Sequence, residues 1–482
     1  MPPPQIENLT ETLQRRLGLQ QAQTFAPEDI LADAIARLVR VRGDVNRVRS
    51  LWKKENAPTL IQDYSAEEHG EALERLRAVL DANLVVQRGR DGLPKTFRPL
   101  IPELITHERV GNIFRELGRT VVDVLWSDTE VRKQLTERVG TWRTRHPLAL
   151  ALAPLCTPAP HDEAVESRLG ELLRHGEDPG LEHWVKTTVT QDWRAWLEAS
   201  AHLSVDEQLD TMTALTCLHL HVALLWRLWH HGQPAVVFVA VSGQEMDRAC
   251  ARAAYNMYGF WGDRAHLALR EVAKQALTRA RNENSEYASL ERPSDFARWA
   301  VASIRGGRSA NDRFQKAVRE KAQGAVEHPE QELVDALVEA FETLSGVATK
   351  VKDFLRGTGR AAGLVGPDVY RARKRYQLDD RLLELLVRLH VHRPSDTVQS
   401  QEEEARGVDA LLDDVFSRYG LVLTTERQSV RTALKAESLR PVLRLLPGDE
   451  AARRNRALLE RRLDELRLVR RYSDASAVLN VD

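Results

Sequence analysis

The stretch CLHLHVALLWRLWHHG, in the middle of the chain, concentrates side chains that could bind a metal ion. They are Cys217, His219, His221, His230 and His231. Cys217 and His221 are four residues apart and would share one helix face, whereas His219 would point elsewhere. Because a zinc site needs three or four converging ligands, we interpret the stretch as a buried apolar helix with histidines at its margin. We predict neither a metal nor a cofactor.

Charged residues follow the apolar run AVVFVAVSG, Ala235–Gly243, the convincing strand of the middle region. Glu245, Asp247 and Arg248 come just beyond it, where the active site of an α/β enzyme would lie. No nucleophile and base with supporting spacing accompany them. We therefore interpret them as the entry to a helical pair that turns at GFWGD. A divergent nuclease or hydrolase with its site near residues 235–247 remains an alternative.

Two basic stretches with glycines resemble phosphate-binding loops without matching one. SIRGGRSANDRFQKAVREK carries Arg305, Arg308 and Arg313 around a Gly-Gly turn, where phosphate contact and a solvated loop are both open interpretations. FLRGTGRAAG lacks the preceding strand that a dinucleotide fingerprint requires. Together with YRARKRY it predicts a basic connector, in which Tyr370 and Tyr376 are available to stack on the bases of a single strand.

Length, net charge, cysteine content and apolar runs restrict the class of protein. A chain of 482 residues is too long for one ordinary core and suggests about three domains. A net charge of −1 means that nucleic-acid affinity has to come from local basic patches. With three cysteines, no secretory signal and no apolar run of the roughly 18 residues that span a bilayer, we expect a cytoplasmic protein without a membrane partner.

Helical periodicity dominates the chain, so we predict a mostly α, multi-domain protein. The polar stretches CTPAPHDEA and HRPSDTVQSQEEEARG mark boundaries between domains. The predicted parts are an N-terminal helical region at 1–156, a central helical domain with one short strand at 157–392, a linker at 393–406 and a C-terminal module at 407–482.

Both ends of the chain predict a helix followed by a hairpin. SAEEHGEALERLRAVLDA has a capping box at Ser65 and Glu68, and NLVVQRGRDGLPKTFRPL then predicts two strands around a tight glycine-containing turn. RNRALLERRLDELRLVRRYSDASAVLNVD repeats the plan with a leucine-rich helix, a strand, the turn SDAS and a second strand. The two ends also share a leucine-and-arginine rhythm.

In this order of elements, both ends resemble the winged-helix family, at about residues 27–104 and 407–482. The resemblance implies that the helix enters the major groove of DNA and that the hairpin contacts the backbone or minor groove. It implies nucleic-acid contacts for Arg75, Arg77, Arg88, Arg90, Lys95 and Arg98 at one end, and for Arg461, Arg462, Arg470 and Arg471 at the other. Winged helices also serve as protein-interaction modules, and a protein-binding role for both ends therefore remains an alternative interpretation.

The C-terminal pattern RYGLVL followed by LLERRLDELRLVRRYSDAS resembles the ends of accessory proteins from prokaryotic DNA-defence gene clusters. That resemblance covers only the C-terminal module and implies that a separate ATPase or nuclease performs the chemistry, in phage resistance. We therefore predict a non-enzymatic subunit that binds nucleic acid, DNA in the first place, or serves as a scaffold. A pure protein-interaction scaffold is the second alternative, beside the divergent nuclease or hydrolase.

Overall fold

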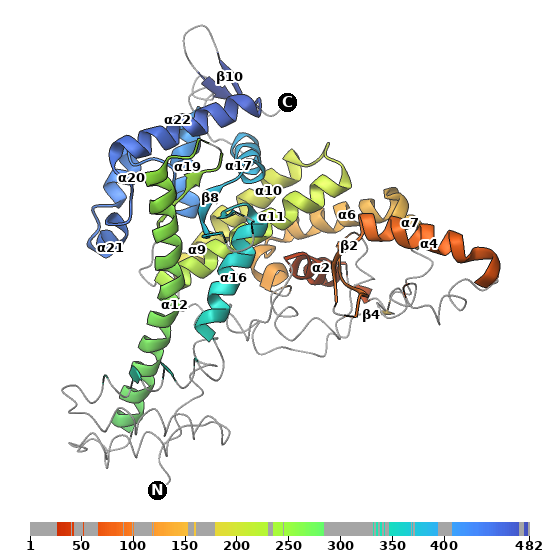
Figure 1. The fold of residues 1–482 in the computed structure, drawn as a ribbon, viewed down its shortest axis with the longest axis horizontal. Helices are drawn as coiled ribbons and strands as arrows, with labels where there is room; N and C mark the ends of the chain where they lie inside the picture. The colour runs from red at the N-terminus through yellow and green to blue at the C-terminus, as the bar shows by residue number, and fades with distance from the viewer. Residues whose placement is uncertain are drawn as a thin grey trace. The chain divides into compact units, whose positions relative to one another are not determined.

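The computed structural model is mostly helical, as the periodicity predicted (Figure 1). The residues that it describes are 27–39, 41–42, 52, 66–89, 91–98, 100, 118, 120–152, 159–160, 179–229, 235–243, 245–283, 331, 334–335, 338–339, 342, 347–367, 369, 372–393, 407–471 and 477–480. The chain divides into two compact units, each built from segments far apart in the sequence. The smaller unit comprises Met1–Thr24, Arg227–His230 and Tyr258–Arg356, and the larger one comprises Phe25–Trp226, His231–Met257 and Gly357–Asp482.

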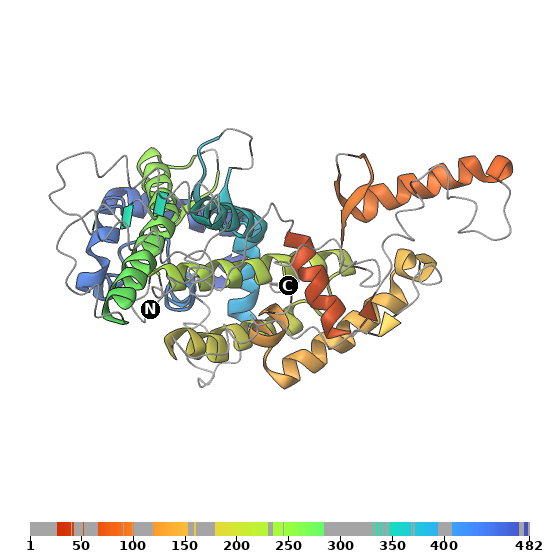
Figure 2. The ribbon, with the colours of Figure 1, turned by 90° about the horizontal axis from the view of Figure 1, so that it is seen from below.

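The N-terminal part of the larger unit contains the predicted helix and hairpin. Its elements are α2 (Pro27–Leu38), β1 (Val41–Arg42), α4 (Ala66–Asn83), β2 (Val85–Arg88) and β3 (Pro94–Phe97). β2 and β3 pair antiparallel, and Figure 2 shows α4, in orange, running directly into them. Gly92 has a φ of 75°, a backbone conformation that favours glycine, and its amide donates to the Gly89 carbonyl within the turn. The predicted hairpin is therefore confirmed.

A group of helices and a tryptophan cluster follow in the chain. The elements are η4 (Val121–Leu125), α6 (Thr129–Arg145), α7 (Pro147–Leu152), β4 (Ala159–Pro160, paired with β1), α9 (Pro179–Trp184), η6 (Val185–Val189), α10 (Thr190–Ala199) and α11 (Val205–Trp229). Trp193 packs edge-on against Trp126 and Trp196, with ring centroids 5.5 and 5.6 Å away. All three rings are buried, and large aromatic surfaces of this kind dominate the energetics of a core.

Helix α11 is long and apolar enough to cross a membrane by length and composition. However, 78% of its most apolar 18-residue window is buried inside the protein. Among the described residues it is the one helix that meets both criteria. Its apolar surface is covered by protein, as expected for the buried central helix that the sequence predicted.

Short strands join the middle of the chain to its C-terminal part. They are β5 (Val237–Phe238), β6 (Ala240–Val241), β7 (Val365–Gly366), β8 (Arg375–Leu378) and β9 (Leu421–Val422). β5 pairs parallel with β9, β6 pairs parallel with β8, and β7 pairs antiparallel with β8. The predicted strand at 235–243 is thus two short strands, and its unidentified partners lie more than 130 residues further along the chain.

The remaining helices and the second hairpin complete the chain. They are α12 (Arg248–Glu283), α16 (Val347–Ala362), α17 (Asp380–His392), α19 (Val408–Tyr419), α20 (Gln428–Ala433), η8 (Glu437–Leu439), α21 (Arg440–Leu443), α22 (Asp449–Glu465), β10 (Val469–Arg471) and β11 (Ala477–Leu479). β10 and β11 pair antiparallel, which confirms the predicted C-terminal hairpin. The stretch FLRGTGRAAG, predicted to be part of a basic connector, is instead helical up to Ala362, and Gly359 allows α16 to approach Val365 closely.

Buried Asn455 of α22 ties the two strand systems together. Its Oδ1 accepts a hydrogen bond from the Val241 amide at 2.9 Å, and its Nδ2 donates to the carbonyls of Val239 at 3.1 Å and Leu423 at 2.8 Å. These backbone groups are part of, or next to, strands only two residues long. The amide side chain therefore supplies hydrogen bonds that the short ladders do not.

The predicted turn at GFWGD is wrong, because these residues lie inside the continuous helix α12. In the smaller unit, buried Trp261 packs against Trp229 with ring centroids 5.5 Å apart. The Lys352 side chain runs past Gly262, and its ammonium pairs with Asp263 at 2.9 Å. These contacts outweigh the intrinsic cost of glycine in a helix, which is about 1 kcal/mol per residue.

Candidate nucleic-acid interface

The N-terminal hairpin is anchored by apolar residues at its root. Leu84, Phe97 and Leu100 are 1%, 5% and 2% exposed, and the Arg98 amide donates to the Leu84 carbonyl at 2.7 Å. β3 also contacts helix α2. Because successive side chains of a strand point to opposite faces, the described polar residues of the hairpin face solvent.

The predicted contact residues of α4 form ion pairs within the helix. Arg75 donates to Glu71 at 2.6 Å and Arg77 donates to Glu74 at 2.7 Å. Arg75 and Glu71 are 77% and 81% exposed, so this pair contributes little to stability and can open. Arg77 is only 12% exposed, so it is poorly placed to reach a phosphate.

The two described arginines of the hairpin pair with acids outside its strands. Arg88 forms an ion pair with Asp81 of α4, and its guanidinium also donates to the Gly92 carbonyl in the turn. Arg98 donates to Asp206 of α11 at 2.8 Å. Both arginines remain about 40% exposed. The hairpin therefore carries cations that solvent reaches, each held by one carboxylate.

At the C-terminal end, two of the four predicted arginines are engaged in ion pairs. Arg461 pairs with Glu245, and Arg462 pairs with Asp380 and Glu465. Arg470 is exposed. Of the other predicted contact residues, Arg90, Arg305, Arg308 and Arg313 lie outside the described residues, as do the side chains of Lys95 and Arg471.

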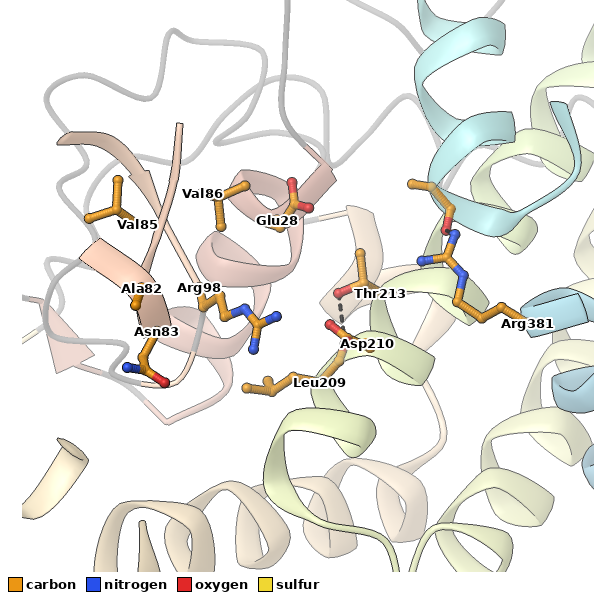
Figure 3. Close-up of a pocket in the computed structure, with 11 residues that line it drawn as sticks. Glu28, Ala82, Asn83, Val85, Val86, Arg98, Leu209, Asp210, Thr213 and Arg381 are labelled. Atoms are coloured by element: carbon orange, nitrogen blue, oxygen red, sulfur yellow. Dashed lines mark hydrogen bonds between the residues drawn. The ribbon is translucent and has the colours of Figure 1, made fainter. Parts of the chain in front are cut away.

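A cavity of about 250 Å³ lies between the N-terminal hairpin and the helices beside it (Figure 3). Figure 3 shows Arg98 reaching in from the hairpin and Arg381 from α17 on the other side, with Asp210 of α11 between them. Arg381 also donates to the Ala361 carbonyl at 2.7 Å. Because Glu28 adds a second acid to the lining, the cavity has no excess of either charge.

The charged residues after strand β6 serve the fold. Asp247 Oδ1 accepts from the amides of Ala249 at 2.8 Å and Cys250 at 3.2 Å, which caps α12, and its Oδ2 accepts from Arg454 of α22 at 2.8 Å. Burial raises the pKa of Asp247, but these hydrogen bonds and the Arg454 charge outweigh it and lower the pKa. This geometry supports the helix-entry interpretation.

The Cys250 thiol is buried and donates to the Ala451 carbonyl at 3.1 Å. Burial raises the pKa of this thiol to about 12. Because the thiolate is the nucleophilic form, Cys250 is unreactive at neutral pH. It is a core residue that links α12 to α22.

The cysteine and histidines of α11 bind different neighbours. His219 Nε2 lies 3.0 Å from Asp192 Oδ2, whereas His221 Nδ1 lies 3.1 Å from Thr358 Oγ1. Burial raises the pKa of the Cys217 thiol well above its usual range. Within the described part of the chain, no group of three or more His, Cys, Asp or Glu side chains converges as metal ligands would. The helix is buried as predicted, but His219 and His221 are 0% exposed and lie in the core and not at its margin, because each has a buried polar partner.

The prediction that Tyr376 stacks on bases is wrong. Tyr376 is 0% exposed, and its hydroxyl lies 3.3 Å from His221 Nε2. The reason is tertiary: β8 lies between β6 and β7, so one face of this strand is directed into the core. Tyr370 lies outside the described residues.

A buried polar network, which sequence reasoning missed, joins α10, α11, α17 and α19. Asp192 Oδ2 accepts from the Tyr419 hydroxyl at 2.6 Å and lies 3.0 Å from His219, while Asp192 Oδ1 accepts from Arg393 Nη2 at 2.6 Å. Arg393 also pairs with Asp414. Asp192 and His219 are 0% exposed, and Arg393, which the sequence assigned to the start of a linker, is 7% exposed.

In this network the positive charge of Arg393 compensates the negative charges of Asp192 and Asp414. Burial raises the pKa of Asp192, but the Arg393 charge and the hydrogen bonds from His219 and Tyr419 outweigh it and lower the pKa. The only sequence signal was Asp192 itself, a carboxylate among the tryptophans of TQDWRAWLEA. Its partner Arg393 is 201 residues away, so no local pattern reveals the pair.

Comparisons with protein-family models, with curated proteins and with solved structures found no match to this chain. Its function therefore has to be inferred from its own residues and contacts.

Proposed function

We propose that this protein is a nucleic-acid-binding subunit whose two helix-and-hairpin ends act as winged-helix modules. The observation that carries the proposal is the N-terminal hairpin: an apolar root holds it in place, and solvent-exposed arginines extend from it. The same order of helix and hairpin recurs at the C-terminus, from α22 to β11. DNA is the proposed ligand, because the guanidinium fork of arginine can hold phosphate oxygens bidentately and because hairpins of winged helices contact the DNA backbone.

The ion pairs of the hairpin are compatible with this role. Asp81 and Asp206 hold Arg88 and Arg98 in defined positions while both guanidiniums keep contact with water. Exposed pairs of this kind contribute only about 0–1 kcal/mol, so a phosphate can displace the carboxylate. The carboxylates lower the affinity for every polyanion, DNA included, because each anion must compete with a local acid.

The chemistry would come from a partner. Asp247 caps α12 and pairs with Arg454, and Cys250 is kept protonated by burial, so the strand end at 235–247 is used for structure. We propose a cytoplasmic subunit that delivers DNA to a separate ATPase or nuclease, in the setting of phage defence. Metal-dependent cleavage of DNA by the purified chain would instead establish the nuclease alternative.

The test measures binding of the full chain to labelled duplex and single-stranded DNA across a salt series. The double variant Arg88→Ala/Arg98→Ala should lower the slope of log K against log salt for duplex by about 1.8, since each phosphate contact contributes about 0.9. Asp81→Asn should strengthen binding, because it releases Arg88 from its competing carboxylate.

Lys186→Ala is the matched control, because Lys186 is an exposed cation in a helical ion pair with Glu182. It should leave DNA binding unchanged. Binding that is indifferent to both hairpin changes, or that falls with Asp81→Asn, would refute a phosphate-contacting role for the hairpin.

A second candidate function, a protein-docking scaffold, is favoured by one observation. Val79 on α4 and Val86 on β2 are 45% and 41% exposed on the same module, where the arginines are already paired with acids. Exposed apolar side chains beside balanced charges suit a protein partner. This function predicts no salt-dependent DNA affinity at all, so the same titration separates the two.

A further inference from the structure

One surface of helix α12 combines cations with an aromatic ring. Arg248, Arg252 and Tyr255 are spaced four and three residues apart, which places them on one face of the helix. All three are exposed, and Tyr255 is 42% exposed. The opposite face is buried through residues such as Cys250 and Ala254, each 0% exposed. The three side chains therefore have a fixed helical base and face solvent. Together with Arg373, they are called the Tyr255 surface.

The loop before strand β8 adds the fourth member. The guanidinium carbon of Arg373 lies 5.8 Å from the centre of the Tyr255 ring, within the range of a cation–π contact. The neighbouring Lys374 folds back and donates to the carbonyls of Pro367 at 2.5 Å and Val369 at 3.1 Å. The loop is thus tied to itself by Lys374, which leaves Arg373 exposed beside the ring.

The arginines of the Tyr255 surface, Arg248, Arg252 and Arg373, have no acidic partner among the residues that the structure describes. The acids that directly precede Arg248 in the sequence, Glu245 and Asp247, pair with Arg461 and Arg454 of α22. This contrasts with the hairpin, where a carboxylate holds each described arginine.

We infer that the Tyr255 surface binds single-stranded nucleic acid, an inference that rests on the proposed nucleic-acid function and names a further contact for it. An exposed tyrosine ring accepts an unstacked base of any sequence, and the three arginines pair with the flanking phosphates. Duplex DNA offers no free base face, so it gains only the electrostatic part. The ion pairs of Glu245 and Asp247 with α22 place this surface beside the C-terminal module.

The experiment compares full-length variants for binding to a labelled oligo(dT) and to a duplex of the same length. Tyr255→Ala should weaken binding of the single strand by roughly 5- to 150-fold, the loss that follows when one base loses its aromatic partner. Tyr255→Phe keeps the ring and should bind nearly as well as the parent. Neither change should alter duplex binding comparably.

The arginines are tested by the salt dependence. Arg248→Ala/Arg252→Ala should lower the single-strand salt slope by about 1.4, since each phosphate contact to a single strand contributes about 0.7. Arg145→Ala is the control, because Arg145 is an exposed cation on α6. All these side chains are exposed, and unchanged circular dichroism and melting temperature should confirm that the variants fold.

The outcomes separate this inference from the proposed function. Single-strand binding that is indifferent to Tyr255→Ala and to the arginine changes overturns the inference alone. Equal losses in Tyr255→Ala and Tyr255→Phe also overturn it, because the hydroxyl would then matter and not the ring. If the hairpin variants bind nucleic acid normally while the variants of the Tyr255 surface lose single-strand binding, the proposed role of the hairpin is refuted and the inference is supported. No binding of any nucleic acid overturns both.

Discussion

Replacing Arg393 with methionine should lower the free energy of unfolding by about 3–5 kcal/mol, because it leaves a buried carboxylate without its cation. The guanidinium donates to Asp192 from Nε at 3.1 Å and from Nη2 at 2.6 Å, and to the Tyr419 hydroxyl at 2.9 Å. It also pairs with Asp414. Arg393 is 7% exposed and Asp192 is 0% exposed, so water cannot replace these bonds.

The expected loss corresponds to one broken buried pair and not to two. Asp192 keeps its contacts with His219 and Tyr419, and Asp414 keeps its ion pair with Arg418. Methionine matches the length of the arginine stem, so little cavity cost is added. The electrostatic loss at Asp192 therefore dominates the change.

Urea denaturation checks the magnitude, followed by circular dichroism and by tryptophan fluorescence. Trp184 and Trp193 both contact the His219 ring, so their share of the tryptophan emission is sensitive to the network. Asp192→Asn in the Arg393→Met background should recover part of the loss, with a coupling of about 2 kcal/mol between the two positions. A loss below about 1 kcal/mol, or strictly additive effects, would refute the assignment of a buried, mutually dependent pair.

Three further predictions concern the fold. Asn455→Leu should cost roughly 2–5 kcal/mol in urea denaturation, because it leaves three buried backbone groups without a partner; a change below about 1 kcal/mol would contradict this. Burial raises the pKa of Asp414, but its bond with His390 and the nearby arginines outweigh it and hold the pKa well below its ordinary value. The stability from this carboxylate is thus present above about pH 4 and lost as the pH falls through the folded pKa, so acid titration of Asp414→Asn should show a shallower loss than the parent. Gly359→Ala should lower the melting temperature, because the new Cβ would lie 2.3 Å from Val365 Cγ2; an unchanged melting temperature would show that the helix shifts freely.

Much of the secondary structure was predictable, since it follows from short-range rules. The hairpins at 85–97 and 469–479 follow from alternating residues around turn-forming ones, and Gly92 adopts the backbone conformation that glycine favours. FLRGTGRAAG has no strand directly before it, as predicted, because α16 begins at Val347 and continues through most of the stretch. Such features depend on neighbours within a few residues, so the sequence alone contains them.

The surface chemistry was less predictable, because the charge of an arginine does not reveal its partner. The described arginines of the hairpin and of α22 were correctly placed on their elements, yet most of them pair with acids from other segments, such as Asp206 and Asp380. Tyr376 was predicted to face solvent and is buried, whereas Tyr255, which no motif marks, is exposed beside Arg373. Which aromatic ring remains accessible depends on how strands and helices pack.

The sequence by itself determined that the protein is mostly helical, with a helix and a hairpin near each end, because periodicity and turn residues act locally. Only the tertiary structure decided the partners: Val237 pairs with Leu421, Asn455 ties three strands, and Asp192 meets Arg393 across 201 residues. Each of these contacts joins segments that are far apart in the chain, and no local sequence pattern indicates that they meet. They form because burial removes water, and each buried polar group must then find its hydrogen bond within the fold.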